Sequence, residues 1–188
     1  YRSNSASARF DPNMLNNIEM DDSFGIVHCS GIMAAISNNG FKSVEKLLKM
    51  ADKNSIYTVF DPNIRQQLWS DKQVMKKSLN YLSSLSKIVI PGINECKILT
   101  GLVDPEQIAN FYFNQSKITK IVIIKDGSKG AYIKVKDKPM DFVNSYQVNK
   151  VVDTVGAGDG FAVGLISGIL EGNSLKFSVK RACAIGAL

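Results

Sequence analysis

The sequence predicts an α/β fold, with a mostly parallel central sheet and helices on both of its faces. Two observations matter here, the first for this fold class and the second for the number of domains. Short apolar runs of the kind found in buried strands alternate along the chain with segments of helical periodicity. Alternation of this kind is typical of parallel strands joined by helices. The second observation is that the 188 residues contain no repeat, low-complexity stretch or linker. We therefore expect a single domain over residues 1–188.

Five segments are predicted as strands. The segment "GAYIKVK" at 130–136 alternates apolar and polar residues, which suits an antiparallel or edge strand. The segment 145–153 then leads into a turn with three closely spaced glycines. The other four strands are predicted from continuous apolar runs at 24–29, 56–60, 87–90 and 120–125.

Six segments are predicted as helices from their apolar periodicity and their capping residues. In 43–54, apolar residues recur on one face, and in 104–113 a proline occupies the first helical position. The others are 70–86 with Ser70 as N-cap, 94–101 ended by Gly101, 157–171, and 174–188 after a break at Gly172–Asn173, while Asp104 caps 104–113.

Composition argues against several classes of function. The net charge is +6 and the pI about 9.2, but the lysines are scattered and no block of five basic residues occurs. We therefore expect a mild attraction for anionic substrates and no nucleic-acid binding. No apolar run reaches 18 residues and no signal peptide is apparent, so we expect a cytoplasmic protein without membrane contact. The spacing of Gly160, Gly164 and Gly168 is interpreted as close packing of a helix in a soluble protein.

Cysteine and histidine chemistry is not favoured. Cys29, Cys96 and Cys183 lie far apart in apolar surroundings, which predicts buried free thiols in a reducing cytosol and no metal site. The single histidine, His28, lies in the apolar run "FGIVHCSGI", which favours a structural role. No G-x-S-x-G nucleophile elbow is present.

Polar residues follow the ends of the predicted strands. In parallel sheets, ligands bind beyond the carboxyl ends of the strands, so these residues are expected to meet at one edge. They are Asp61, Asn63 and Arg65 after 56–60, Glu95 after 87–90, Lys125 and Gly127 after 120–124, and Gly156 to Asp159 after 151–153.

The segment "VVDTVGAGDGFAVG" combines a glycine-rich turn with a carboxylate. It closes with no G-K-[ST], and Phe161 stands where a dinucleotide fingerprint needs its third glycine. In phosphoryl transfer, Asp159 could take the proton of an acceptor hydroxyl while the backbone N–H groups of residues 156–158 stabilise the transferring group. The alternative is that Asp159 only complements the dipole of a helix N-terminus.

The string "DTVGAGDGF" resembles the D-T-x-G-A-G-D signature of the ribokinase-like carbohydrate kinases. This resemblance implies the ribokinase-like three-layer sandwich and ATP-dependent phosphoryl transfer with Mg²⁺. It implies Asp159 as catalytic base and the backbone of Gly156, Ala157 and Gly158 as anion hole. Asp153 matches the first aspartate of the signature, which helps to organise the turn.

The stretch "IPGINECKILTG" is similar to the metal-linked N-x-x-E motif of the same family. The resemblance implies that Glu95 acts on Mg²⁺ through water molecules. The asparagine position falls on Gly92, so the sequence departs from the motif there. The alternative for Glu95 is an acid in the first turn of a helix.

The stretch "IVIIKDGSKGAYI" is similar to the nucleotide segment of the family. The resemblance implies ATP contacts for Lys125, Gly127 and Gly130, in addition to Gly156 and Gly158. Taken alone, D-G-S-K-G is an ordinary hairpin turn, and the two interpretations are compatible.

The stretch "VFDPNIRQQLWS" resembles the 2-keto-3-deoxygluconate kinases within the family. Arg65 suits a substrate with a carboxylate, because a guanidinium binds a carboxylate with two parallel hydrogen bonds. The N-terminal "YRSNSASARF" implies a second substrate arginine at Arg2. The alternative for Arg65 is a surface ion pair, and Arg2 lies near the chain end.

The resemblance covers essentially all 188 residues. Relative to the family pattern, the sequence lacks the N-terminal strands, the lid and the last helices. We therefore expect a chain truncated at both ends, from a full-length protein that forms homo-oligomers. The expected activity is transfer of the γ-phosphoryl of ATP to the primary hydroxyl of 2-keto-3-deoxygluconate. The alternatives are a kinase of a neutral sugar such as fructose or ribose, or of a nucleoside, and an inactive nucleotide-binding fragment.

Overall fold

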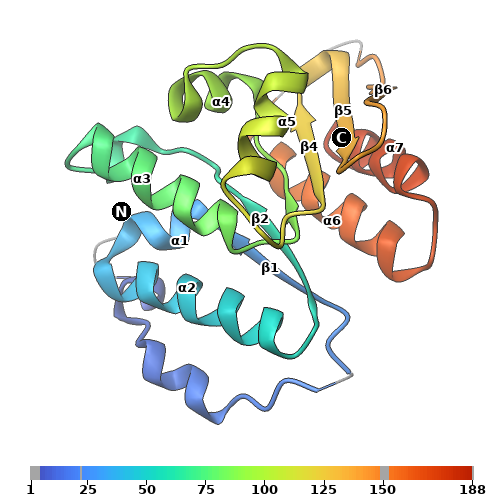
Figure 1. Ribbon diagram of the computed structural model, residues 1–188. Helices are drawn as coiled ribbons and strands as arrows, with labels where there is room; N and C mark the ends of the chain where they lie inside the picture. Colours follow the sequence, from blue (N-terminus) through green and yellow to red (C-terminus); the bar gives the residue numbers. More distant parts are fainter. Residues whose placement is uncertain (1–4, 22, 149–152, 188) are drawn as a thin grey trace.

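The computed structural model describes residues 5–21, 23–148 and 153–187 (Figure 1). Its six-stranded sheet has the strands in chain order, β1-β2-β3-β4-β5-β6. The first four strands are parallel to one another, and the last two pair antiparallel. The strands are β1 (Ile26–Ser30), β2 (Tyr57–Asp61), β3 (Ile88–Val89), β4 (Ile121–Lys125), β5 (Gly130–Val135) and β6 (Asp141–Asn144).

The five predicted strands are confirmed, and the antiparallel direction of β5 is confirmed with them. In contrast, β5 is not an edge strand, because β6 pairs with its outer side. The sequence did not reveal β6, since its four residues include a single buried one and produce no apolar run. Residues 145–148 form no strand, and residues 149–152 of the segment expected to lead into the glycine turn lie outside the described residues.

The predicted helices are all present. One cap differs from expectation: the N-cap of α3 is Asp71 rather than Ser70, because the Asp71 carboxylate accepts the N–H groups of Gln73 and Val74. A short helix before α2 was not predicted. The helices are α1 (Gly31–Ile36), α2 (Asn38–Lys53), α3 (Lys72–Ser84), α4 (Ile93–Thr100), α5 (Pro105–Asn114), α6 (Ala157–Leu170) and α7 (Leu175–Ile185), with 3-10 turns η1 (Ala6–Arg9), η2 (Pro12–Asn17), η3 (Gln66–Leu68) and η4 (Gly127–Lys129).

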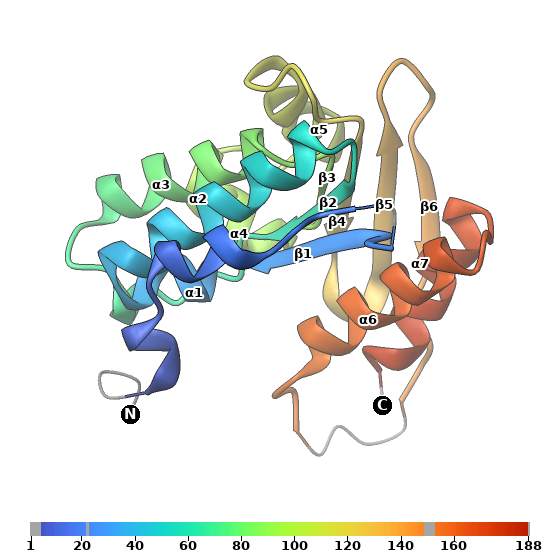
Figure 2. The same cartoon turned by 90° about the horizontal axis from the view of Figure 1, so that it is seen from below.

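The elements form three layers. Figure 2 shows the sheet between α1–α5 on one side and α6 and α7 on the other. Successive side chains of a strand point to opposite faces, so Phe60 packs among Leu48 and Leu79 while its neighbour Val59 packs with Leu165. The expected helix layers on both faces of a mostly parallel sheet are therefore confirmed.

The glycines of α6 serve helix packing, as expected. A Cβ atom on Gly164 would lie 2.6 Å from the Cα atom of Ala182, and one on Gly168 would lie 2.7 Å from the Cβ atom of Ser178. Both partner residues belong to α7, so the small residues let the two helices approach closely. In the described part of the chain, no helix is long and apolar enough to cross a membrane.

The three cysteines are buried free thiols, as predicted. Burial raises the pKa of Cys29 and of Cys96 to about 12, which keeps both in the unreactive thiol form at neutral pH.

Candidate active site

The carboxyl ends of the parallel strands meet at one edge of the sheet. The last residues of β1 and β2, Ser30 and Asp61, lie opposite each other. A further bridge joins Gly92, just after β3, to Lys125 at the end of β4. The strand-end loops that the sequence marked as chemical are thus brought together.

A buried ion pair lies at this edge. The Lys125 Nζ atom is 2.6 Å from Oδ2 of Asp61, and the two side chains are only 18% and 3% exposed. The other carboxylate oxygen of Asp61, Oδ1, accepts the N–H of Asn63 at 3.1 Å. Sequence reasoning singled out both partners but not their pairing, which depends on the side-by-side placement of two strand ends.

The N-terminus of α6 lies against the ion pair. A Cβ atom on Gly158 would be 4.0 Å from Oδ2 of Asp61. The N-cap, Gly156, has a left-handed φ of 85° and no side chain to accept a hydrogen bond. The Ala157 N–H donates to the carbonyl oxygen of Thr154 at 3.3 Å. The other first N–H groups of a helix have no acceptor within it, and donors of this kind suit an anion. Asp159 lies in the same first turn and is exposed.

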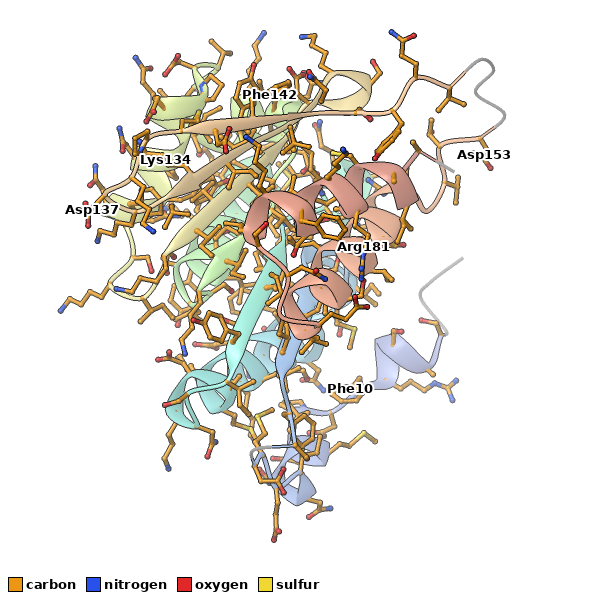
Figure 3. The ribbon with its side chains drawn as sticks, turned by 90° about the vertical axis from the view of Figure 1, so that its right-hand side faces the viewer. Phe10, Lys134, Asp137, Phe142, Asp153 and Arg181 are labelled. Carbon is orange, nitrogen blue, oxygen red and sulfur yellow. The ribbon has the colours of Figure 1, made fainter. Side chains whose placement is uncertain are left out.

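The start of the glycine turn is organised by Asp153. Its Oδ1 atom accepts the N–H of Val155 at 2.9 Å, and the role that the family resemblance implies for Asp153 stays a prediction. Figure 3 shows Asp153 at the opposite end of the molecule from Lys134 and Asp137. The turn therefore lies far from the hairpin that joins β5 and β6.

Both oxygens of Glu95 accept backbone hydrogen bonds. Oε2 accepts the N–H of Gly92 at 2.7 Å, and Oε1 accepts the N–H of Ile64 at 2.6 Å. The first bond agrees with the helix-acid alternative, and the second was not predicted. Glu95 is partly exposed, so contact with a hydrated cation is compatible with these bonds.

The donor set at this edge fits a cation bound mainly by other molecules. Among the described residues, no three His, Cys, Asp or Glu side chains form a group that could hold a metal. Mg²⁺ commonly keeps several waters and is held by one or two carboxylates together with substrate phosphates. The implied role of Glu95, through water, fits this arrangement.

The nucleotide segment forms the predicted hairpin between β4 and β5. Gly127 and Gly130 both have positive φ, of 53° and 133°. A Cβ atom on Gly130 would lie 1.9 Å from the carbonyl oxygen of Val143, so close pairing of β5 with β6 requires this glycine. The ATP contacts expected of Lys125 and the two glycines remain predictions.

Arg65 is exposed and bonds only locally. Its guanidinium donates to the carbonyl oxygen of its neighbour Ile64 at 3.0 Å. Within the part of the chain that the structure describes, no carboxylate forms an ion pair with Arg65, so its charge is available to a ligand. Arg2, the second arginine expected at the substrate, lies outside the described residues.

His28 lies nearer to this edge than its apolar neighbours suggested. It is exposed on β1, opposite Val59 of β2. Crowding by surrounding protein atoms lowers the pKa of His28; the negative charge of Asp159 opposes this shift, and the positive charge of Lys125 adds to it. Sequence reasoning assigned His28 a structural role and did not reveal that its side chain is exposed, unlike those of Val27 and Cys29 beside it.

Comparison with known proteins gives matches over the whole chain. The family described as "pfkB family carbohydrate kinase" matches residues 2–188. A 2-dehydro-3-deoxygluconokinase of Bacillus subtilis is 44% identical over 165 residues, which cover 87% of this chain and 50% of that protein. The chain thus spans about half the length of this curated relative.

Solved structures show the same fold. A PfkB protein from Polaromonas sp. JS666 superposes with a TM-score of 0.81 at 33% identity, over 99% of this chain and 58% of that one. A fructokinase from Vibrio cholerae, in a form with fructose, ADP and calcium ion bound, has a TM-score of 0.81 at 26% identity, over 93% of this chain and 57% of that one. These neighbours confirm the predicted fold class.

Proposed function

Because this chain belongs to the pfkB family of carbohydrate kinases, we propose that its protein transfers the γ-phosphoryl of ATP to the primary hydroxyl of 2-keto-3-deoxygluconate. The observation that carries the proposal is the uncapped N-terminus of α6, which lies against the buried Asp61–Lys125 pair where the strand ends meet. The similarity to the Bacillus subtilis kinase, whose name gives the same sugar acid, supports this substrate.

In the proposed reaction, Asp159 is the base. The hydroxyl oxygen of the sugar attacks the γ-phosphorus, the bond from phosphorus to the ADP oxygen breaks, and the hydroxyl proton passes to the Asp159 carboxylate. Asp159 is exposed, so its carboxylate is open to an acceptor. The N–H groups of Gly156, Ala157 and Gly158 stabilise the charge on the transferring group from a fixed position.

The nucleotide is assigned to the neighbouring strand ends. Lys125 ends β4, Gly127 follows it, and Gly130 begins β5; all three contact the ATP phosphates in this proposal. Bound Mg²⁺ would neutralise phosphate charge, and Glu95 would contact its water shell.

The sugar carboxylate is assigned to Arg65, with Arg2 as a second partner. Arg65 is exposed, and among the described residues its guanidinium donates only to the neighbouring carbonyl, which leaves most of its five donors for a ligand. A neutral sugar offers no carboxylate to this guanidinium, so the residue favours an acidic substrate.

The proposal is tested by measuring ADP release by the intact protein with ATP, Mg²⁺ and one of three sugars. Turnover with 2-keto-3-deoxygluconate and little with fructose or ribose is expected. The variant Arg65→Ala should raise the KM for the sugar acid by about tenfold or more while the KM for ATP stays unchanged. Equal changes in both KM values would exclude the carboxylate role, and turnover with none of the sugars would exclude the proposed substrate.

A neutral sugar is the second candidate. The similarity to the fructokinase from Vibrio cholerae, whose structure holds fructose, favours it. A strong preference for fructose over the sugar acid in the same assay would support this candidate. In that case Arg65→Ala should leave the KM for fructose unchanged.

A further inference from the structure

Glu95 joins two of the strand-end loops. One of its carboxylate oxygens accepts the N–H of Gly92, at the start of its own helix α4. The other accepts the N–H of Ile64, which is 31 residues away in the loop after β2, at 2.6 Å. Hydrogen bonds to an ionised carboxylate are short and strong, so this side chain ties the β2 loop to the β3 loop.

Ile64 forms backbone hydrogen bonds with the side chains of both Glu95 and Arg65. The Ile64 N–H donates to Glu95, and the Ile64 carbonyl accepts the Arg65 guanidinium at 3.0 Å. The side chain of Ile64 is buried, which fixes it from the core side as well. The position of the arginine therefore depends on where Glu95 holds Ile64.

The same loop contains a residue in an unfavourable backbone conformation. Asn63 has a left-handed φ of 38°, and its N–H donates to the buried Asp61 carboxylate. Two successive N–H groups, those of Asn63 and Ile64, are thus held by two carboxylates from different elements. A backbone in a sparsely populated conformation persists where the surroundings over-determine it, and such sites cluster at ligand clamps.

We infer that Glu95 is a positioning residue for Arg65, and that it thereby sets the specificity of the site for a substrate carboxylate. The inference rests on the proposed function and adds to it a role that does not pass through the metal. A glutamate that acts only on hydrated Mg²⁺ has no need to bond Ile64, whereas one that places Arg65 does. Altering the Glu95 carboxylate changes the KM for the sugar acid if it positions Arg65, and the half-saturating Mg²⁺ concentration if it acts on the cation.

The deciding variant is Glu95→Gln in the intact protein. A glutamine keeps the size of the side chain but replaces one acceptor oxygen by an NH₂ group, which cannot accept the second N–H. We expect the KM for 2-keto-3-deoxygluconate to rise by about tenfold, and to rise by the same factor when Mg²⁺ is saturating. In an Arg65→Ala background, the same change should have no further effect on that KM, because its effect passes through the arginine.

A calorimetric titration with the sugar acid alone, without nucleotide or Mg²⁺, gives a readout independent of turnover. Weaker binding by Glu95→Gln is expected there as well. The matched control is Asp104→Ala, which removes a carboxylate that accepts a helix N-terminal N–H in α5; its KM and binding should equal those of the wild type. If Glu95→Gln does not fold, Glu95→Asp keeps the charge but shortens the reach, and a rise in the sugar-acid KM is again expected.

Three outcomes would overturn the inference. One is a shift in the half-saturating Mg²⁺ concentration with an unchanged KM for the sugar acid, which would place Glu95 at the cation. Another is an unchanged KM in both Glu95 variants, and the third is a full additional effect in the Arg65→Ala background. Absence of transfer to the sugar acid by the wild type is a separate result, because it refutes the proposed function before any variant is compared.

Discussion

The N-termini of α5 and α6 are built in opposite ways. At α5, the Asp104 side chain accepts the N–H of Gln107 at 2.9 Å, Pro105 removes one donor, and Glu106 adds a negative charge. At α6, the N-cap is Gly156, which has no side chain, and the only acid of the first turn is the exposed Asp159.

The two helix starts differ in whether a side chain caps them. In the described part of the chain, every other α-helix has at least one N-terminal N–H group that donates to a side chain. Five have a Ser or Asp cap, and at α4 the Glu95 carboxylate accepts the N–H of the N-cap residue. The five caps are Ser30, Ser37, Asp71, Asp104 and Ser174. Among these helices, α6 alone has no side chain that accepts an N-terminal N–H, although its Ala157 N–H donates to the carbonyl oxygen of Thr154 at 3.3 Å.

The largest effect is expected from Asp159→Asn. The amide cannot take the proton of the acceptor hydroxyl, so kcat should fall by about 100-fold or more, while calorimetric ATP binding stays the same. The matched change at the other helix start, Glu106→Gln, should leave kcat unaltered. Normal turnover by Asp159→Asn would reduce this aspartate to a helix-dipole acid like Glu106 and remove the contrast.

The second effect concerns the buried Asp61–Lys125 ion pair beside the N-terminus of α6 and its contribution to stability. Under α6, Asp61→Ala would leave Lys125 without its partner in a mostly buried position, and the free energy of unfolding should fall by about 3 kcal/mol. Urea denaturation measures this loss. The control is Lys176→Ala, which breaks an ion pair that is exposed on both sides; it should change stability little. Similar losses in the free energy of unfolding of both variants would mean that the buried Asp61–Lys125 pair stabilises the fold no more than an exposed ion pair does.

A smaller effect is expected from Gly156→Ala. The added Cβ meets no atom within 4 Å, so the cost comes from the left-handed backbone alone and should be about 1–2 kcal/mol of stability. Gly101→Ala, at the end of α4, has nearly the same φ and equally open space, and should cost a similar amount. Kinase activity should fall only in Gly156→Ala; a loss of activity in both would show a general effect of destabilisation.

The smallest effect is expected from Asp104→Ala at the start of α5. Loss of this side-chain cap should lower the free energy of unfolding by about 1 kcal/mol. Asp104→Asn keeps a capping oxygen and should recover most of that loss. A change in the KM for either substrate in Asp104→Ala would contradict the assignment of this helix start to stability alone.

Much of the architecture could be predicted from local pattern. The strands β1 to β4 follow apolar runs and β5 follows an alternating pattern, while Asp104 and Gly101 mark a helix start and a helix end by their residue types. Other features could not be seen this way. The strand β6 has too few buried residues to form an apolar run. The residue types alone favoured Ser70 as the N-cap of α3, whereas the carboxylate of Asp71 accepts the N–H groups there.

The candidate site divides in the same manner. The glycine turn and its Asp159 are contiguous in sequence, so their chemistry can be inferred from the string that contains them. The pairing of Asp61 with Lys125 joins residues 64 positions apart, and the bond from Ile64 to Glu95 joins residues 31 positions apart. No local pattern encodes those distances.

The sequence by itself determined the fold class, most of the elements and the residues able to take part in chemistry, because hydrophobic periodicity and capping are local properties of the chain. The tertiary structure decided which of those residues meet. Parallel pairing of β1 to β4 aligns their carboxyl ends, and the packing of α6 on the sheet places Gly158 against Asp61. Such contacts arise only after distant segments have packed together, since they depend on the geometry of the whole sheet.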